Sequence, residues 1–277
     1  MNNIAALFTL APVVKGFIAL MISGACFPLC GVMVVRLDLI PMRYMLMHGV
    51  ILGGAIALAL SLPVIPVSVV INILLVFILL LFTKDSAHGF STGSAASMVV
   101  SMALASLVMH SADVPAKDTL SLIWGSPFAL NVSDIVLLIV ISVLLILYIV
   151  FNFRSILALF YNQEIASSLG IRVHTHYTIM VLIIAFVVAT AMKLLGAFLI
   201  DALLLLPVLI TSSVLSSRKK AAGIKMLFIL SCFTGFLLAT IGFIIAVIFD
   251  LPPSSAIALF AGLLYFITGI HRKRSSK

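Results

Sequence analysis

The sequence predicts an all-α protein, a polytopic bundle of about eight or nine transmembrane helices formed by a single domain, residues 1–277. The first observation is composition, because 64% of the residues are hydrophobic and only 9% are charged, whereas a soluble domain carries about 25% charged residues. Such an excess of apolar side chains can face outward only in hydrocarbon. The second observation is the repeated occurrence of uncharged stretches of about 20 residues, the length that a helix needs to cross a bilayer.

Prolines and charged residues divide the chain into nine expected spans. The uncharged stretch 44–83 is too long for one span, and its segment 61–66 contains two prolines, which break helices and favour turns. The region around Lys193 allows two interpretations, a pair of spans or one long broken helix. The expected spans are 17–35, the two halves of 44–83, 89–109, 135–153, 177–192, 194–217, 226–249 and 251–270.

The basic residues indicate the orientation, because Lys and Arg concentrate in cytoplasmic loops. If the segment after Phe153 is cytoplasmic, only Lys15, Lys117 and Lys193 fall outside. The C-terminus is then cytoplasmic and the N-terminus external, as in a multi-pass protein of a bacterial inner membrane. The residues that fall inside are Arg36, Arg43, Lys84, Arg154, Arg172, Arg218, Lys219, Lys220, Lys225, Arg272, Lys273, Arg274 and Lys277.

The same features exclude several classes of function. The net charge of +8 is explained by topology and lipid contact, so we expect no nucleic-acid partner. We expect no enzyme activity, because no long soluble loop and no phosphate-binding glycine loop are present; the energy for any transport must come from a partner or from an ion gradient. Three cysteines at irregular spacing give neither a disulfide framework nor a zinc pattern, and no removable signal peptide is expected.

The longest polar cytoplasmic segment, about 154–176, is expected to contain a short amphipathic helix. Apolar residues recur in it at helical spacing, and Gly170 suits the C-terminal end of a helix. Such a helix between two spans can lie on the membrane surface or bind in a groove of a partner protein. The residues at helical spacing are Leu157, Phe160, Tyr161, Glu164, Ile165 and Leu169.

Three motifs resemble those of the permease subunits of zinc-, manganese- and iron-type ABC importers. Residues 160–171 (FYNQEIASSLGI) resemble the coupling segment Phe-Asp-x-Glu-x-Ala-x-x-x-Gly-Ile of that family. Residues 195–207 (LGAFLIDALLLLP) are similar to Val-Gly-x-Leu-Leu-Val-x-Ala-Leu-Leu-x-x-Pro, and 250–256 (DLPPSSA) to Asp-x-Pro-Ser-Gly-Ala. The motifs occur in the family's order and at its spacing, so the resemblance extends over nearly the whole chain.

The resemblance implies a permease that has no permanently bound cofactor and does not bind ATP itself. It implies cytoplasmic ABC ATPase subunits that hydrolyse ATP, an extracytoplasmic solute-binding protein and a second permease subunit, in a homodimer or a paired permease. The coupling helix would contact the ATPase, and Asn162 stands where the family usually has Asp. The coupling residues that the resemblance implies are Phe160, Tyr161, Glu164, Ala166 and Gly170.

His48 is the first candidate ligand for the transported metal. Ionisable groups inside the membrane are costly and are therefore functional candidates, and imidazole binds zinc, manganese and iron. The alternative is a structural histidine bonded to a backbone carbonyl. The family has an Asp-x-x-x-His pair in this span; His48 matches the histidine, but Tyr44 occupies the Asp position.

Asp201 is the candidate for the missing carboxylate. It lies within an apolar span, at a position where the family usually has a small residue, and a carboxylate at mid-span costs on the order of 2.5–3.5 kcal/mol. We expect Asp201 to bind the metal together with His48, with Tyr44 lining the site. The alternatives are a structural hydrogen bond to a neighbouring helix and an ion pair with Lys193.

Two other functions remain open for the sequence. A permease of the same architecture that carries a metal chelate or another small nutrient is favoured by Tyr44. A secondary transporter coupled to an ion gradient would need several acidic residues in the membrane, and only Asp201 is clearly there. The resemblance favours import of a divalent metal, Zn, Mn or Fe.

Overall fold

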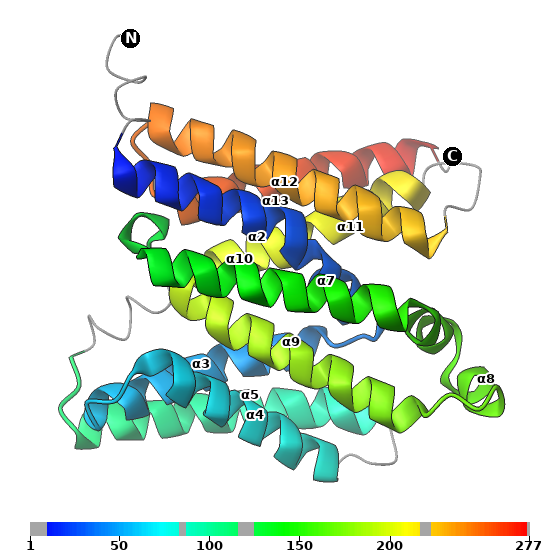
Figure 1. Ribbon diagram of the computed structural model, residues 1–277, viewed down its shortest axis with the longest axis horizontal. Helices are drawn as coiled ribbons and strands as arrows, with labels where there is room; N and C mark the ends of the chain where they lie inside the picture. Colours follow the sequence, from blue (N-terminus) through cyan, green and yellow to red (C-terminus); the bar gives the residue numbers. More distant parts are fainter. Residues whose placement is uncertain (1–9, 83–86, 116–124, 217–222, 276–277) are drawn as a thin grey trace. The chain divides into compact units, whose positions relative to one another are not determined.

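The chain is helical wherever the structure describes it. The computed structural model describes residues 10–82, 87–115, 125–216 and 223–275, with the backbone alone for 87, 88 and 271–275 (Figure 1). No strand occurs in these ranges, which confirms the all-α prediction. The elements are α2 (Ala11–Arg36), α3 (Ile40–Ala59), α4 (Val64–Phe82), α5 (Ala87–Ser111), η1 (Pro127–Ala129), α7 (Val132–Tyr161), α8 (Gln163–Ser168), α9 (Val173–Leu195), α10 (Ala197–Leu204), α11 (Leu206–Ser216), α12 (Ile224–Ile248) and α13 (Pro253–Ser275).

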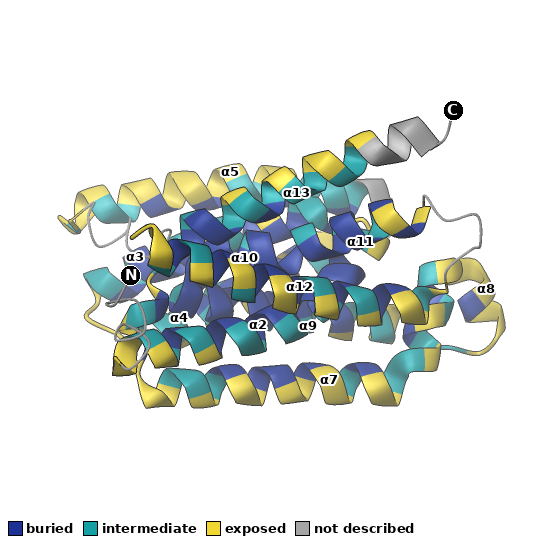
Figure 2. Cartoon of the chain, turned by 90° about the horizontal axis from the view of Figure 1, so that it is seen from above, coloured by how far each residue is buried: buried dark blue, intermediate teal, exposed yellow. Residues whose placement is uncertain are grey.

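Nine helical segments within the described residues are long and apolar enough to cross a membrane, as predicted, with α10 and α11 together forming one of them. Exposed residues run along α5 and α7 (Figure 2). In α4 only 22% of the most apolar window is buried, although its mean hydropathy is 3.0. An apolar surface of this kind is stable against lipid tails but not against water.

Contacts between Cα atoms divide the chain into two compact units. Unit 1 contains Met1–Val32, Ser126–Leu147 and Phe198–Lys277, and unit 2 contains Met33–Gly125 and Tyr148–Ala197. The chain therefore passes between the units four times, within α2, between Gly125 and Ser126, within α7 and near the start of α10. The prediction that 1–277 form a single transmembrane domain stays a prediction.

In unit 2, α3 packs against α4, α5 and α9, and α4 also packs against α9. Two glycines of α3 allow the close approach of α4. A Cβ atom added to Gly53 would lie 2.5 Å from Cα of Ser68, and one added to Gly49 would overlap the side chain of Asn72. These contacts confirm that residues 49–53 form a small-xxx-small packing motif, in which glycine lets two helix backbones approach.

Several helices of unit 2 begin at the same end of the unit. Consecutive helices α3, α4 and α5 alternate in direction, so α3 and α5 begin at the end of the unit where α8 lies, and α9 begins there as well (Figure 1). The basic residues Arg43 and Arg172 belong to these helix starts, whereas Lys193 lies near the far end of α9. The basic residues Lys84, Lys117, Arg218, Lys219, Lys220 and Lys277 lie outside the described residues.

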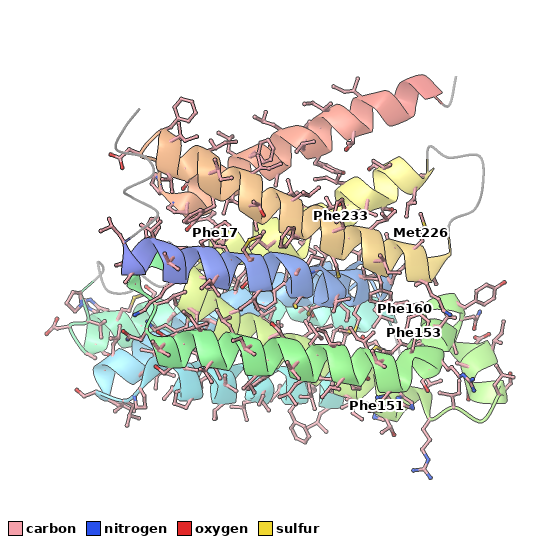
Figure 3. The ribbon with its side chains drawn as sticks, turned by 45° about the horizontal axis from the view of Figure 1, so that its top comes forward. Phe17, Phe151, Phe153, Phe160, Met226 and Phe233 are labelled. Atoms are coloured by element: carbon pink, nitrogen blue, oxygen red, sulfur yellow. The ribbon has the colours of Figure 1, made fainter. Side chains whose placement is uncertain are left out.

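Unit 1 is organised around α12, which packs against α11 and α13. A core of Ile210, Leu238 and Ala261 joins these helices. On another side α12 meets α2, where a Cβ atom added to Gly24 would lie 2.6 Å from the carbonyl oxygen of Gly235. Phe17 of α2, labelled in Figure 3, stacks on Phe243 with ring centroids 5.3 Å apart.

Backbone chemistry explains where the helices end. Ser61 has a φ of 55° just beyond α3, and the amide of Leu62 donates to the carbonyl of Ala57 at 2.8 Å; this turn confirms the predicted break at 61–66. Gly196, with φ 91°, separates α9 from α10, three residues beyond Lys193. Positive φ values of this kind are readily adopted by glycine, and the structure thus has two helices rather than one in this region.

One predicted boundary is wrong. The span expected over 135–153 continues as α7 to Tyr161, with non-helical dihedral angles at Asn152 (φ −106°, ψ 15°). The side-chain amide of Asn152 donates through Nδ2 to the backbone carbonyl of Tyr148 at 3.1 Å. Residues 154–161 are therefore the end of α7 after a kink, and the separate amphipathic helix is limited to α8.

Candidate functional site

Asn162 determines where α8 begins. Its side-chain oxygen accepts hydrogen bonds from the backbone amides of Glu164 at 2.7 Å and Ile165 at 3.1 Å. Its backbone is extended, with φ −166° and ψ 129°, so the chain turns sharply between α7 and α8. Asn and Asp are about equally good at this N-cap position. The replacement of the family's Asp by Asn162 therefore keeps the cap and removes one negative charge.

Gly170 ends α8. Its φ is 78°, its amide donates to the carbonyl of Ser167 at 3.0 Å, and the amide of Ile171 donates to that of Ala166 at 3.1 Å. This pair of bonds is the Schellman motif, which requires a left-handed residue and therefore favours glycine. The prediction that Gly170 ends a helix is confirmed.

α8 is a short helix capped at both ends, and the residues in and around it differ in how far they are exposed. Tyr161 and Leu169 are 80% and 70% exposed, whereas Ala166 is fully buried. Glu164 and Gly170 are exposed as well. Phe160 is half-buried, and it lies with Phe153 at the end of α7 beside α8 (Figure 3). Among the predicted coupling residues, Ala166 thus contributes to packing, whereas Tyr161 and Glu164 can be touched by another protein.

Sequence reasoning did not assign Leu169 to the coupling residues. Leu169, Ile165 and Tyr161 are all exposed and follow one another at intervals of four residues. Ile165 lies in α8 and Leu169 is its C-cap, so these two share one face of the helix, whereas Tyr161 is the last residue of α7. The spacing was visible in the sequence, but the exposure of that face was not.

His48 of α3 is bonded through one ring nitrogen. Its Nδ1 lies 2.9 Å from the carbonyl oxygen of Tyr44. A carbonyl oxygen only accepts hydrogen bonds, so in the neutral form of the ring Nδ1 carries the proton and Nε2 keeps its lone pair. Nδ1 thus makes the hydrogen bond to a backbone carbonyl that a structural histidine would make. Nε2 is left as the ring nitrogen that could bind a metal.

Tyr44, at the position of the expected carboxylate, is 42% exposed. Its ring contacts the guanidinium of Arg43, whose Cζ lies 4.1 Å from the ring centroid. Arg43 itself is only 1% exposed, so the position at which the resemblance implies Asp in the family carries an aromatic ring with a cation on its face. This stacked pair is a typical cation–π arrangement.

Asp201 lies in α10 and is half-buried. It belongs to unit 1, whereas His48 and Tyr44 belong to unit 2. The pairing of Asp201 with His48 therefore stays a prediction. Among the residues that the structure describes, no group of three or more His, Cys, Asp or Glu side chains is arranged to hold a metal ion, and Cys26, Cys30 and Cys232 are free thiols.

Comparison with known proteins decides the family. The model of the ABC 3 transport family matches residues 11–272, which is nearly the whole chain. The chain belongs to the ABC 3 transport family. The order of the three motifs in the sequence is thereby explained as a family property.

Two curated relatives of this ABC 3 family chain carry informative names. The high-affinity zinc uptake system membrane protein ZnuB of Buchnera aphidicola subsp. Acyrthosiphon pisum is 27% identical over 180 residues, 65% of either chain. The manganese import system permease protein ScaB of Streptococcus pneumoniae is 26% identical over 153 residues, 55% of this chain and 53% of that protein. The matched part thus spans less than two thirds of these relatives.

A solved structure, PsaBC from Streptococcus pneumoniae in complex with Fab, has the same fold. The TM-score is 0.80 at 20% identity, and the match covers 96% of this chain and 94% of that chain. This likeness confirms the permease architecture expected for an ABC 3 family member.

Proposed function

We propose that the chain is the membrane-spanning permease subunit of an ABC transporter that imports a divalent transition metal, zinc, manganese or iron. The match of the ABC 3 transport family to residues 11–272 carries this proposal. The names of the relatives, a zinc uptake protein and a manganese import permease, support zinc or manganese as the cargo. The chain has no ATP site of its own, and the ATP is hydrolysed on partner subunits.

The transported metal binds His48 through Nε2. The hydrogen bond between Nδ1 and the carbonyl of Tyr44 supports this role, because it fixes the ring and its tautomer. Asp201 supplies the carboxylate that hard divalent cations favour, and Tyr44 lines the site.

α8 is the coupling helix that binds the cytoplasmic ATPase subunits. The exposed Glu164 of α8 makes the contact, together with Phe160 and the exposed Tyr161 at the end of α7, while buried Ala166 and the left-handed Gly170 maintain the shape of α8. A short helix with both ends capped transmits movement without fraying.

The working transporter contains three further components. A solute-binding protein delivers the metal on the external face, a second copy of the permease completes a homodimer, and lipid covers the exposed apolar helices. The C-terminus lies in the cytoplasm of a cell with this protein in its inner membrane. The alternating helix directions and the basic helix starts of unit 2 support this orientation.

A metal chelate is the second candidate cargo. It is favoured by Tyr44, since a phenol with Arg43 on its face cannot replace a carboxylate as a ligand for a bare dication. A chelate brings its own ligands and needs fewer from the protein.

Uptake into proteoliposomes tests the proposal. The permease is reconstituted with its ATPase and binding protein, and ATP-dependent uptake of zinc, manganese and iron is measured. We expect uptake of at least one free metal, and a loss of on the order of tenfold or more for His48→Ala and for Asp201→Asn, since each removes a ligand.

His110→Ala is the matched control, because His110 is an exposed histidine in the last turn of α5; its uptake should equal that of the wild type. Uptake of a chelated metal alone would favour the second candidate. Transport that proceeds without any ATPase would disprove both.

A further inference from the structure

α4 buries two polar side chains among the apolar ones. Its buried residues are Ser68, Asn72, Val76 and Leu79, and both Ser68 and Asn72 have no exposed surface. This stripe faces the glycines of α3. An amide in such a place costs free energy unless its polar atoms are bonded, and an apolar side chain would fill the same space more cheaply.

Asn72 is only partly satisfied by its own helix. Its Nδ2 donates to the carbonyl of Ser68 at 3.0 Å. No hydrogen-bond donor within the described part of the chain reaches its Oδ1. This oxygen lies against Gly49, where an added Cβ atom would clash with it. A glycine Cα–H group can therefore serve as its weak donor, and only glycine leaves room for the amide.

A second bond fixes the same turn of α3. The hydroxyl of Ser68 donates to the carbonyl of Val50 at 3.4 Å. The side chains of Ser68 and Asn72 thus touch α3 at the two residues that follow His48 directly. Two polar contacts on successive residues restrict both the sliding of a helix and its rotation about its own axis.

We propose that Asn72 is a positioning residue for the cargo site. By docking its amide on Gly49 it fixes the rotation of α3, and with it the direction of His48 Nε2. The inference rests on the proposed role of His48 as a cargo ligand. It makes metal selectivity, and not only stability, depend on a residue that never contacts the metal.

The test compares single and double variants in the reconstituted transporter. Zinc uptake and manganese uptake are measured for each variant. Asn72→Ala should lower uptake on the order of tenfold and change the zinc-to-manganese ratio by about twofold or more. Asn72→Leu, which keeps the branching of the side chain but removes its polar atoms and adds volume, should do the same. In a His48→Ala background Asn72→Ala should leave the ratio unchanged.

The glycines provide the matched control. A Cβ atom on Gly49 meets the side chains of Asn72 and Leu75, so the effect of Gly49→Ala on uptake should be partly relieved in Gly49→Ala/Asn72→Ala. A Cβ atom on Gly53 instead meets the backbone of Ser68, so Gly53→Ala should not be relieved by Asn72→Ala. Equal behaviour of the two glycines, or an unchanged metal ratio in both Asn72 variants, overturns the proposal.

The same measurements separate this proposal from the proposed function. If the wild type takes up metal but His48→Ala does so equally well, the role of His48 fails, and the positioning role of Asn72 fails with it. If His48→Ala abolishes uptake while Asn72→Ala and Asn72→Leu keep the wild-type ratio, only the positioning role is wrong.

Discussion

Asn162 is exposed, yet its side chain stabilises the first turn of α8. It is the acceptor for two amides of α8. We predict that Asn162→Ala lowers the stability of the first turn of α8 by about 1 kcal/mol, whereas Asn162→Asp keeps it. The amides of Glu164 and Ile165 should exchange with deuterium about fivefold faster in the alanine variant, and ATP-driven uptake should fall in parallel.

The aspartate variant is the control for this prediction. It restores the cap with a negative charge, which the N-terminus of a helix favours. Equal exchange rates in the alanine and aspartate variants would contradict the role of the cap.

Some important single residues could be identified from the sequence, and others could not. His48 stood out because an ionisable group in an apolar stretch is conspicuous, and Gly170 because glycine is common where helices end. Asn72 did not stand out, because an uncharged amide in a long apolar stretch has no distinctive spacing. Its importance depends on Gly49, a residue 23 positions away that only helix packing brings into contact.

The crossing of α2 and α12 rests on two glycines. A Cβ atom on Gly235 would lie 2.6 Å from Cγ of Pro28 and would overlap the carbonyl of Gly24. We therefore predict that Gly235→Ala lowers the free energy of unfolding by about 1–3 kcal/mol, the typical cost of overpacking. Thermal unfolding of the purified protein in detergent measures this change.

Gly262 provides the comparison, because a Cβ atom there meets nothing within 4 Å. Gly262→Ala should leave the melting temperature unchanged or raise it slightly, since alanine is the better helix former. If both variants melt alike, the close crossing does not contribute to stability.

The membrane-spanning helices were predictable from the sequence, because the thickness of the hydrocarbon core sets their length. Hydropathy and proline identified all nine spans, because each must be about 20 apolar residues long. The end of α7 was not predictable in this way, since outside the membrane no solvent boundary stops a helix. There the kink at Asn152 and the cap at Asn162 set the shape and the end of the helix. Each of them depends on local hydrogen bonds made by its own side chain.

The orientation of the whole molecule in its membrane can be measured directly. Ser168 of α8 and Ser61 beyond α3 are both exposed and belong to unit 2. We predict that Ser168→Cys reacts with a membrane-impermeant maleimide only from the cytoplasmic side, and Ser61→Cys only from the outside. The reason is that cationic loops stay in the cytoplasm.

Protein without an added cysteine gives the background in this experiment, because Cys26, Cys30 and Cys232 all lie within membrane-spanning helices. Labelling of both new cysteines from one side would contradict the topology. Labelling with the two sides exchanged would place α8 outside and remove its access to an ATPase.

At the scale of the whole chain, the sequence predicted the architecture better than the cargo site. The motifs lie in family order, and the family match covers residues 11–272. The proposed ligands Asp201 and His48 belong to different units. Such a pair leaves no spacing pattern in the sequence, because neither helix periodicity nor hydropathy links residues so far apart.

The cap of α8 has an evolutionary consequence. Asparagine and aspartate codons differ by a single nucleotide, and both side chains accept the amide hydrogen bonds that begin this helix. Position 162 can therefore gain or lose a negative charge in one mutational step while the helix stays folded. Such a position lets a permease lineage adjust its electrostatic match to a diverging ATPase without passing through an uncoupled intermediate.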